Sequence, residues 1–89
     1  MNILFSNSAW AQYQYWQIED KKILSRINEL IKAIQREPFK GIGKPELLRQ
    51  NLKGFWSRRI NKEHRLVYRI VGKIDKGQHI EILSCRFHY

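Results

Sequence analysis

The fold of this chain is decided by residues 55–71, FWSRRINKEHRLVYRIV, where the sequence switches to a period of two residues. Such a period, in a stretch rich in β-branched and aromatic side chains, is typical of strands. We predict strands at Phe55–Ile60 and Arg65–Val71, joined by the turn Asn61-Lys62-Glu63, and a third strand at His79–Phe87. Because short connections join antiparallel strands, the three are expected to form a meander.

Apolar residues with the spacing of a helix precede these strands. Apolar residues of the segment 23–34 recur at steps of one and three, which predicts a helix with one continuous apolar face. Asp20 is suited to cap its start. Pro38 is expected to end it, because the residue before a proline is disfavoured in helical geometry.

The first part of the chain predicts one more strand and one more helix. Ile3-Leu4-Phe5 is an apolar run suited to a short strand, and the aromatic residues of segment 9–16 recur at helical spacing. Ser6 and Ser8 are both candidates for the cap of that helix. Further along, residues 46–49 are expected to form one helical turn after a proline.

Two adjacent helices followed by strands predict an α+β fold, with an antiparallel β-sheet and an N-terminal helical hairpin packed on one face. The chain has 89 residues, which is enough for one hydrophobic core, so we expect residues 1–89 to form a single domain.

The charge of the chain indicates a polyanionic partner. Lysine and arginine number 17 against 8 acidic residues, for a formal charge of +9, and nucleic acid is the leading candidate. A domain that is merely basic is the alternative, and spread of the charge over strands and loops argues against a membrane surface. A single cysteine and no apolar segment suited to secretion or to membrane insertion predict a cytoplasmic protein.

The distribution of titratable groups suggests chemistry on RNA. Metal-free cleavage needs a base for the ribose 2′-hydroxyl, an acid for the leaving 5′-oxygen, and cations for the phosphorane charge. Glu46 is the candidate base, Arg59 and Arg65 are the candidate cations, and His88 is the candidate acid. We expect no metal site, because Cys85 and His88 have ligand-like spacing but lack a second pair.

The two arginines can meet only in one register of the predicted hairpin. A three-residue turn opposes Arg59 to Arg65, and such a pair suits a bound phosphate. A two-residue turn would instead oppose Arg59 to His64, and an opposed pair separated by water is equally compatible with the sequence. A last strand that runs to Phe87 would hold His88 and Tyr89 in place.

Several blocks of the sequence resemble the YoeB-type toxins of the RelE/ParE superfamily. The resemblance covers essentially the whole chain and is most specific in GKPELLR (43–49), NLKGFWSRRI (51–60), EHRLVY (63–68) and CRFHY (85–89). It implies a fold like that of microbial ribonucleases. It also implies a toxin of a type II toxin–antitoxin pair that cleaves mRNA in the ribosomal A site.

The same resemblance implies roles for individual residues. Glu46 would be the general base, His88 the general acid and Arg65 the stabiliser of the phosphorane, with neither a metal nor a cofactor. The products would be a 2′,3′-cyclic phosphate and a 5′-hydroxyl. Supporting or RNA-binding roles would fall to Arg59, Glu63, Tyr89, Arg49 and Lys44.

Partners follow from the resemblance too: mRNA and the ribosome, a YefM-type antitoxin with an acidic, flexible C-terminal segment, and a second copy in a homodimer. The chain departs from the family pattern at Leu47, at Arg49 and in a longer connection over Gly72–Gln78. Two other functions remain open at this point, a non-catalytic inhibitor on the same fold and a plain RNA-binding module.

Overall fold

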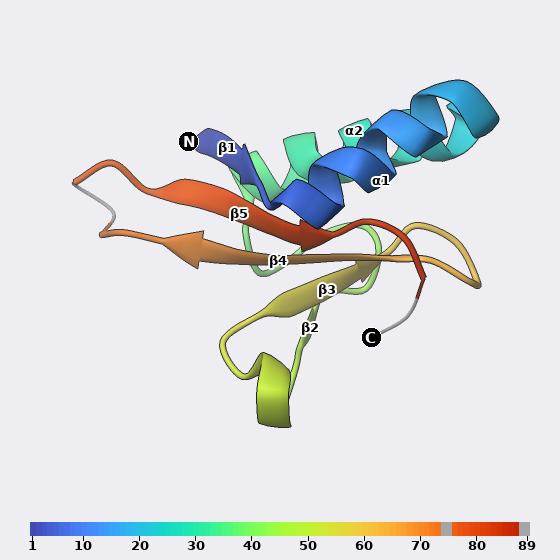
Figure 1. Cartoon of the computed structure of the whole chain (residues 1–89). Coiled ribbons are helices and arrows are strands. Elements are labelled where there is room, and N and C mark those ends of the chain that lie inside the picture. Colours follow the sequence, from blue (N-terminus) through green and yellow to red (C-terminus); the bar gives the residue numbers. More distant parts are fainter. Residues whose placement is uncertain (74–75, 88–89) are drawn as a thin grey trace.

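Two helices cover one face of a five-stranded sheet in the computed structural model, which describes residues 1–73 and 76–87 (Figure 1). The α+β class and the packing of both helices on one face are therefore as predicted. The elements follow in the order β1 (Asn2–Phe5), α1 (Asn7–Glu19), α2 (Lys21–Arg36), β2 (Glu46–Leu47), the 3₁₀ helix η1 (Gln50–Leu52), β3 (Trp56–Arg59), β4 (Arg65–Val71) and β5 (His79–Ser84).

The helical hairpin turns on a single residue. Asp20 ends α1 through its backbone N–H, which donates to the carbonyl of Trp16 at 3.1 Å, and its carboxylate accepts from the N–H groups of Lys22 and Ile23 at the start of α2. One residue thus satisfies orphan groups at two helix ends. Ser6 is the cap of α1, as its hydroxyl accepts from the N–H of Ala9.

The sheet is mixed. Its order is β1-β5-β4-β3-β2, and strands β3, β4 and β5 form the predicted antiparallel meander. β1 pairs with β5 in parallel, so the last strand of the chain lies beside the first, and it separates β1 from β4. The sequence predicted antiparallel pairing throughout, because a period of two residues does not encode strand direction.

Two predictions about local structure are wrong. Residues 46–49 do not form a helical turn, because Glu46–Leu47 pairs as β2 with Ser57 and Trp56 of β3 and helical structure begins only at η1. The last strand ends at Ser84, and the chain bends at residues 85–87. Long-range contacts override local preference at both places.

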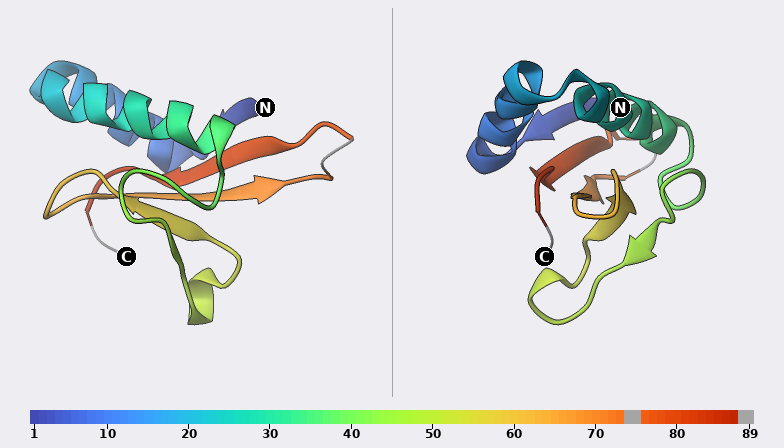
Figure 2. Two further views of the ribbon diagram at one scale, coloured as in Figure 1. Left: turned by 180° about the vertical axis from the view of Figure 1, so that it is seen from behind. Right: turned by 90° about the vertical axis from the view of Figure 1, so that its right-hand side faces the viewer.

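The hydrophobic core lies between the helices and one face of the sheet (Figure 2). Every second residue of the strands points into it, including Leu66 and Tyr68 of β4, which meet Ile27, Leu30 and Ile34 of α2. Neither α1 nor α2 covers the opposite face, where Arg59 is exposed and Ser57 and Val67 are buried. No helix in the described part of the chain is long and apolar enough to span a membrane.

Candidate active site

Three of the predicted site residues share the helix-free face of the sheet. Arg59 and Arg65 are directly opposed across β3 and β4, as the three-residue turn predicts. Glu46 opposes Ser57, and Ser57 in turn opposes Val67. Directly opposed residues and those two apart along a strand point to the same face. Glu46, Arg59 and Arg65 therefore point the same way.

The spacing of this group follows from sheet geometry. With strands about 4.8 Å apart and about 3.3 Å per residue, the Cα atoms of Glu46 and Arg65 lie roughly 12 Å apart. Opposed residues such as Arg59 and Arg65 have Cβ atoms about 5 Å apart. Since glutamate and arginine side chains are long, both ends of such a span can reach one phosphodiester group.

The loop that delivers Glu46 is attached to β3 beside Arg59. The N–H of Arg59 donates to the carbonyl of Gly43 at 2.6 Å. Gly43 has a φ of +84°, and a Cβ there would lie 2.8 Å from Cδ2 of Leu30 and 3.0 Å from Cβ of Arg58. Only glycine fits both the conformation and the space, so this close approach fixes where β2 begins.

A buried arginine, which is not among the predicted site residues, holds the earlier part of the same loop. The guanidinium of Arg58 donates from Nη2 to the carbonyls of Glu37 (2.7 Å) and Lys40 (2.9 Å), and from Nη1 to that of Ile42 (3.1 Å). Its Nε donates to the hydroxyl of Tyr68 at 3.2 Å. The strand alternation was a usable signal, because Arg58 shares the core-facing side with Trp56 and Ile60.

Tyr68 completes this clamp. Its hydroxyl donates to the carbonyl of Pro38 at 2.6 Å. Burial raises the pKa of this phenol, while the hydrogen bond and charge of Arg58 act in the opposite sense. The phenol therefore stays protonated and remains a donor at neutral pH.

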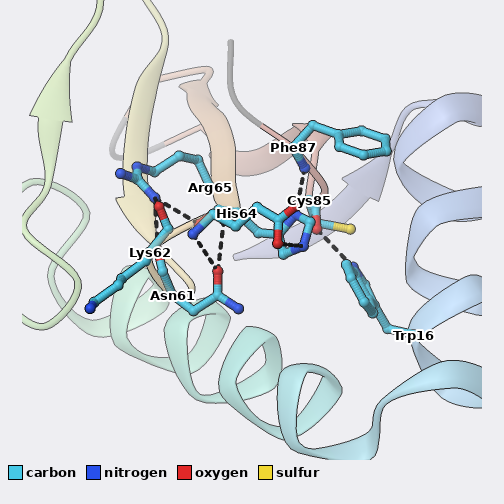
Figure 3. A network of polar contacts seen from close by, with 8 residues as sticks. Trp16, Asn61, Lys62, His64, Arg65, Cys85 and Phe87 are labelled. Carbon is cyan, nitrogen blue, oxygen red and sulfur yellow. Dashed lines mark hydrogen bonds and ion pairs between the residues drawn. The ribbon is translucent and has the colours of Figure 1, made fainter.

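Arg65 is fixed by the turn that precedes it (Figure 3). Its Nη1 donates to the carbonyls of Asn61 (2.8 Å), His64 (3.1 Å) and Lys62 (3.4 Å). The side chain is half-buried, whereas that of Arg59 is exposed. Arg65 is thus held in one orientation by neutral acceptors, which leave its charge to act on an anion.

The other predicted site residues lie around this group. Lys44 and Arg49 are exposed on either side of Glu46, and residues 46–52 line a hollow that contains both Glu46 and Arg49. The carboxylate of exposed Glu63 lies 3.6 Å from Nε2 of His64.

The predicted acid, His88, and its neighbour Tyr89 lie outside the described residues. The last described residue, Phe87, accepts a hydrogen bond at its carbonyl from the N–H of Arg65 at 3.1 Å. The described part of the chain therefore ends at a residue that is bonded to Arg65.

Cysteine and histidine form no metal site in the ranges 1–73 and 76–87, where no group of three or more His, Cys, Asp or Glu side chains could hold an ion. Cys85 is fully buried and donates from Sγ to the carbonyl of Ala9 at 3.6 Å. Burial raises the pKa of this thiol to about 12. His79 lies beside Glu81 at 3.3 Å, at the other end of β5 from Cys85.

Comparison with known proteins identifies the family. Residues 5–89 match the family model described as the YoeB-like toxin of bacterial type II toxin–antitoxin systems. The chain belongs to the YoeB-like toxins. It is 57% identical to the toxin YoeB of Synechocystis sp. over 89 residues, which are all of this chain and 98% of that protein.

Solved structures agree with the YoeB-like assignment. A YoeB/ParE toxin from Agrobacterium tumefaciens superposes with a TM-score of 0.95 at 46% identity, and all of both chains is covered. A YoeB from Staphylococcus aureus has been solved as a dimer (TM-score 0.88, 52% identity) and in a heterotetrameric YoeB–YefM complex (0.87, 51%). Both S. aureus structures match 100% of this chain, and the match covers 98% of the S. aureus YoeB chain.

The connection predicted to be longer than in the family, Gly72–Gln78, joins the ends of β4 and β5 that lie away from Arg65. Val71 pairs with His79 at one end of β4, and Arg65 lies at the opposite end. The described residues of this connection, 72–73 and 76–78, follow the end of β4 that is remote from Arg65. Leu47 and Arg49, in contrast, directly flank the predicted base in β2 and the residues after it.

Proposed function

We propose that this protein is a ribosome-dependent endoribonuclease that cleaves mRNA in the ribosomal A site and so inhibits translation in the cytoplasm. One observation supports this most. A carboxylate from β2 and two guanidinium groups from β3 and β4 point from the sheet face that the helices leave open, and Phe87, the residue before the proposed acid, is bonded to Arg65.

The proposed reaction needs no metal or cofactor, because side chains supply the base, the acid and the cations. Glu46 takes the proton of the ribose 2′-hydroxyl, and that oxygen attacks the adjacent phosphorus. The bond from phosphorus to the 5′-oxygen breaks, and His88 protonates the leaving oxygen. The products are a 2′,3′-cyclic phosphate and a 5′-hydroxyl.

The arginine pair acts on charge that develops during this reaction. Arg65 and Arg59 balance the extra negative charge of the phosphorane, and fixed cations are effective because they need no rearrangement at the moment of reaction. Arg65 meets this condition through its bonds to the turn carbonyls. Lys44 and Arg49 hold the RNA backbone on either side of Glu46, and Glu63 and Tyr89 support the site.

Protein partners follow the pattern of relatives. We propose that a YefM-type antitoxin with an acidic, flexible C-terminal segment neutralises the toxin, since a charge of +9 favours such a segment. The toxin is proposed to form a homodimer as well, as the relative from S. aureus does.

The proposal is tested by cleavage of a translated message. Purified wild type, Glu46→Gln and His88→Gln are added to a cell-free translation reaction, and new 5′ ends are mapped. Loss of a general acid or base lowers the rate by about 10²–10⁴-fold. Glu19→Gln, an exposed glutamate at the end of α1, is the matched control and is expected to cleave like wild type.

Two results would overturn the proposal. One is equal cleavage by wild type, Glu46→Gln and His88→Gln, which would remove the acid–base pair from the mechanism. The other is arrest of translation without any new 5′ end, which would favour a non-catalytic inhibitor.

A further inference from the structure

His64 is a buried histidine in the turn that carries Arg65, and the reaction proposed above does not use it. Its ring lies edge-on to Trp16, with 4.8 Å between ring centroids, and 5.9 Å from the ring of Phe87. Its Nδ1 accepts a hydrogen bond from the N–H of Phe87 at 2.7 Å (Figure 3). The ring therefore contacts both α1 and the segment that leads to position 88.

The same turn fixes the backbone of His64. The side chain of Asn61 accepts from the N–H groups of Glu63 (2.9 Å) and His64 (2.7 Å), and the carbonyl of His64 accepts from the N–H of Ile60. Arg65 donates to carbonyls of this turn as well. The imidazole and the catalytic guanidinium are thus parts of one rigid unit.

The segment 85–87 is anchored by hydrogen bonds at both of its ends, Cys85 and Phe87. Trp16 donates from Nε1 to the carbonyl of Cys85 at 2.9 Å, and the N–H of Cys85 donates to Gln12 at 2.7 Å. Phe87 is bonded on both sides, to His64 through its N–H and to Arg65 through its carbonyl.

The backbone of Phe87 needs these bonds. Its φ is +66°, a left-handed conformation that bulky residues adopt only where the surroundings enforce it. The anchor furthest along the described chain is the pair of bonds at Phe87, one of which is made by a side chain.

The chemistry of imidazole restricts how this bond can form. A ring nitrogen accepts a hydrogen bond only when it carries no proton, so His64 has its hydrogen on Nε2, the nitrogen that faces the carboxylate of Glu63 at 3.6 Å. A residue without an acceptor at the Nδ1 position would leave the N–H of Phe87 without this partner.

We propose that His64 is a positioning residue, whose unprotonated Nδ1 holds Phe87, the residue before the proposed acid, in the conformation beside Arg65 that the reaction needs. This inference rests on the proposed function, because it assigns the acid to His88. If His64 only filled the core, its replacement would make the protein less stable. In that case the replacement would not change the kcat of the molecules that remain folded.

Two substitutions separate these roles. His64→Asn puts an amide oxygen near the place of Nδ1 and keeps an acceptor, whereas His64→Leu keeps apolar volume without one. The full chain of each is compared with wild type in the cell-free cleavage reaction, with rates corrected for the folded fraction. We expect kcat to fall about 10–100-fold in His64→Leu, with KM within twofold, because small misplacements of a catalytic group have effects of this size. His64→Asn should recover most of the loss.

Nuclear magnetic resonance tests the contact itself, independently of cleavage. In wild type the Phe87 amide should be protected from hydrogen exchange, and Nδ1 of His64 should give the nitrogen signal of an unprotonated acceptor. The protection should be lost in His64→Leu and kept in His64→Asn.

The outcomes are distinguishable. Free exchange of the Phe87 amide in wild type, or full kcat in His64→Leu, overturns this inference while the nuclease assignment stands. Wild type that cuts no message overturns both. If His64→Leu does not fold, the wild-type resonances and the kcat of His64→Asn decide: a protonated Nδ1, or an Asn variant as inactive as one lacking His88, overturns the inference.

Discussion

Three arginines close together in the sequence have three different environments. Arg58 is fully buried and bonded to loop carbonyls, Arg59 is exposed, and Arg65 is half-buried with one nitrogen bonded to its own turn. Strand alternation separates the first two, since neighbours in a strand face opposite sides of the sheet. The same residue type therefore serves as a structural clamp in one position, and in the next it is the proposed phosphate ligand.

Replacement of Arg58 by lysine should be strongly destabilising. A compact ammonium group cannot reach the carbonyls of Glu37, Lys40 and Ile42 together, and a buried charge without its partners costs on the order of 3–5 kcal/mol. The neighbouring control, Arg59→Lys, should change the free energy of unfolding by about 0.5 kcal/mol or less. Urea denaturation measures both, and equal stability of the two variants would contradict the clamp.

The thiol of Cys85 should be inert in the folded protein. Its pKa is raised to about 12 by burial, so almost no thiolate is present at pH 8. We expect no reaction with an aromatic disulfide reagent at pH 8 until guanidinium unfolds the chain. Reaction of the native protein within minutes would contradict this.

Burial of the thiol also gives stability a dependence on pH. The unfolded thiol ionises near its ordinary value of 9.0 and the folded one near 12, so the unfolded state binds fewer protons between these values. The stabilisation by the neutral buried thiol is complete below about pH 9 and is lost as the pH rises toward 12.

At the scale of elements, the helical hairpin depends on Asp20. Its carboxylate accepts from two N–H groups of α2, and the loss of an N-cap costs about 1–2 kcal/mol. We expect Asp20→Ala to lower the free energy of unfolding by this amount in urea, and Asp20→Asn, which keeps the accepting oxygen, to stay near wild type. An alanine variant as stable as wild type would show that packing alone sets the hairpin.

The sequence predicted elements well where the evidence for them is local. The apolar face of α2, its cap at Asp20 and the register of β3 against β4 all follow from spacing and from one turn, and the structure confirms them. β2 has two residues, too few for a period, and it forms only because Trp56 and Ser57 lie opposite. The anchoring of Phe87 by His64 joins segments 23 residues apart, so no local pattern could predict it.

The candidate site was predicted to a similar extent. The opposition of Arg59 and Arg65 was one of two registers that the sequence left open, and the structure has the register of the three-residue turn. The catalytic roles of Glu46, Arg65 and His88 remain predictions. Arg58 and His64 were missed, because arginine and histidine are mostly exposed. The strand alternation does place Arg58 on the core-facing side, but the burial of His64 depends on the tertiary structure.

At the scale of the whole molecule, the net charge predicts salt-sensitive binding of RNA. With a charge of +9 and the arginine pair on an open face, the logarithm of the binding constant for single-stranded RNA should fall linearly with the logarithm of salt concentration. Each phosphate contact contributes about 0.7 to that slope for single strands. Arg59→Gln should therefore lower the slope by about 0.7.

Fluorescence anisotropy of a labelled oligonucleotide between 50 and about 200 mM salt measures this slope, in the range where such binding typically changes most. Lys21→Gln, at the exposed start of α2, is the control and should leave the slope close to that of wild type. A slope that does not respond to Arg59→Gln would remove that residue from the RNA-binding surface.

The place of β5 in the sheet has a consequence for folding of the nascent chain. β5 lies between β1 and β4, yet its residues are the last of the strands to leave the ribosomal exit tunnel. Until then β1 has no strand to pair with, and the helices have only part of a sheet to cover. Folding must wait for these long-range pairings. A chain built in this order completes its sheet only after β5 has left the exit tunnel.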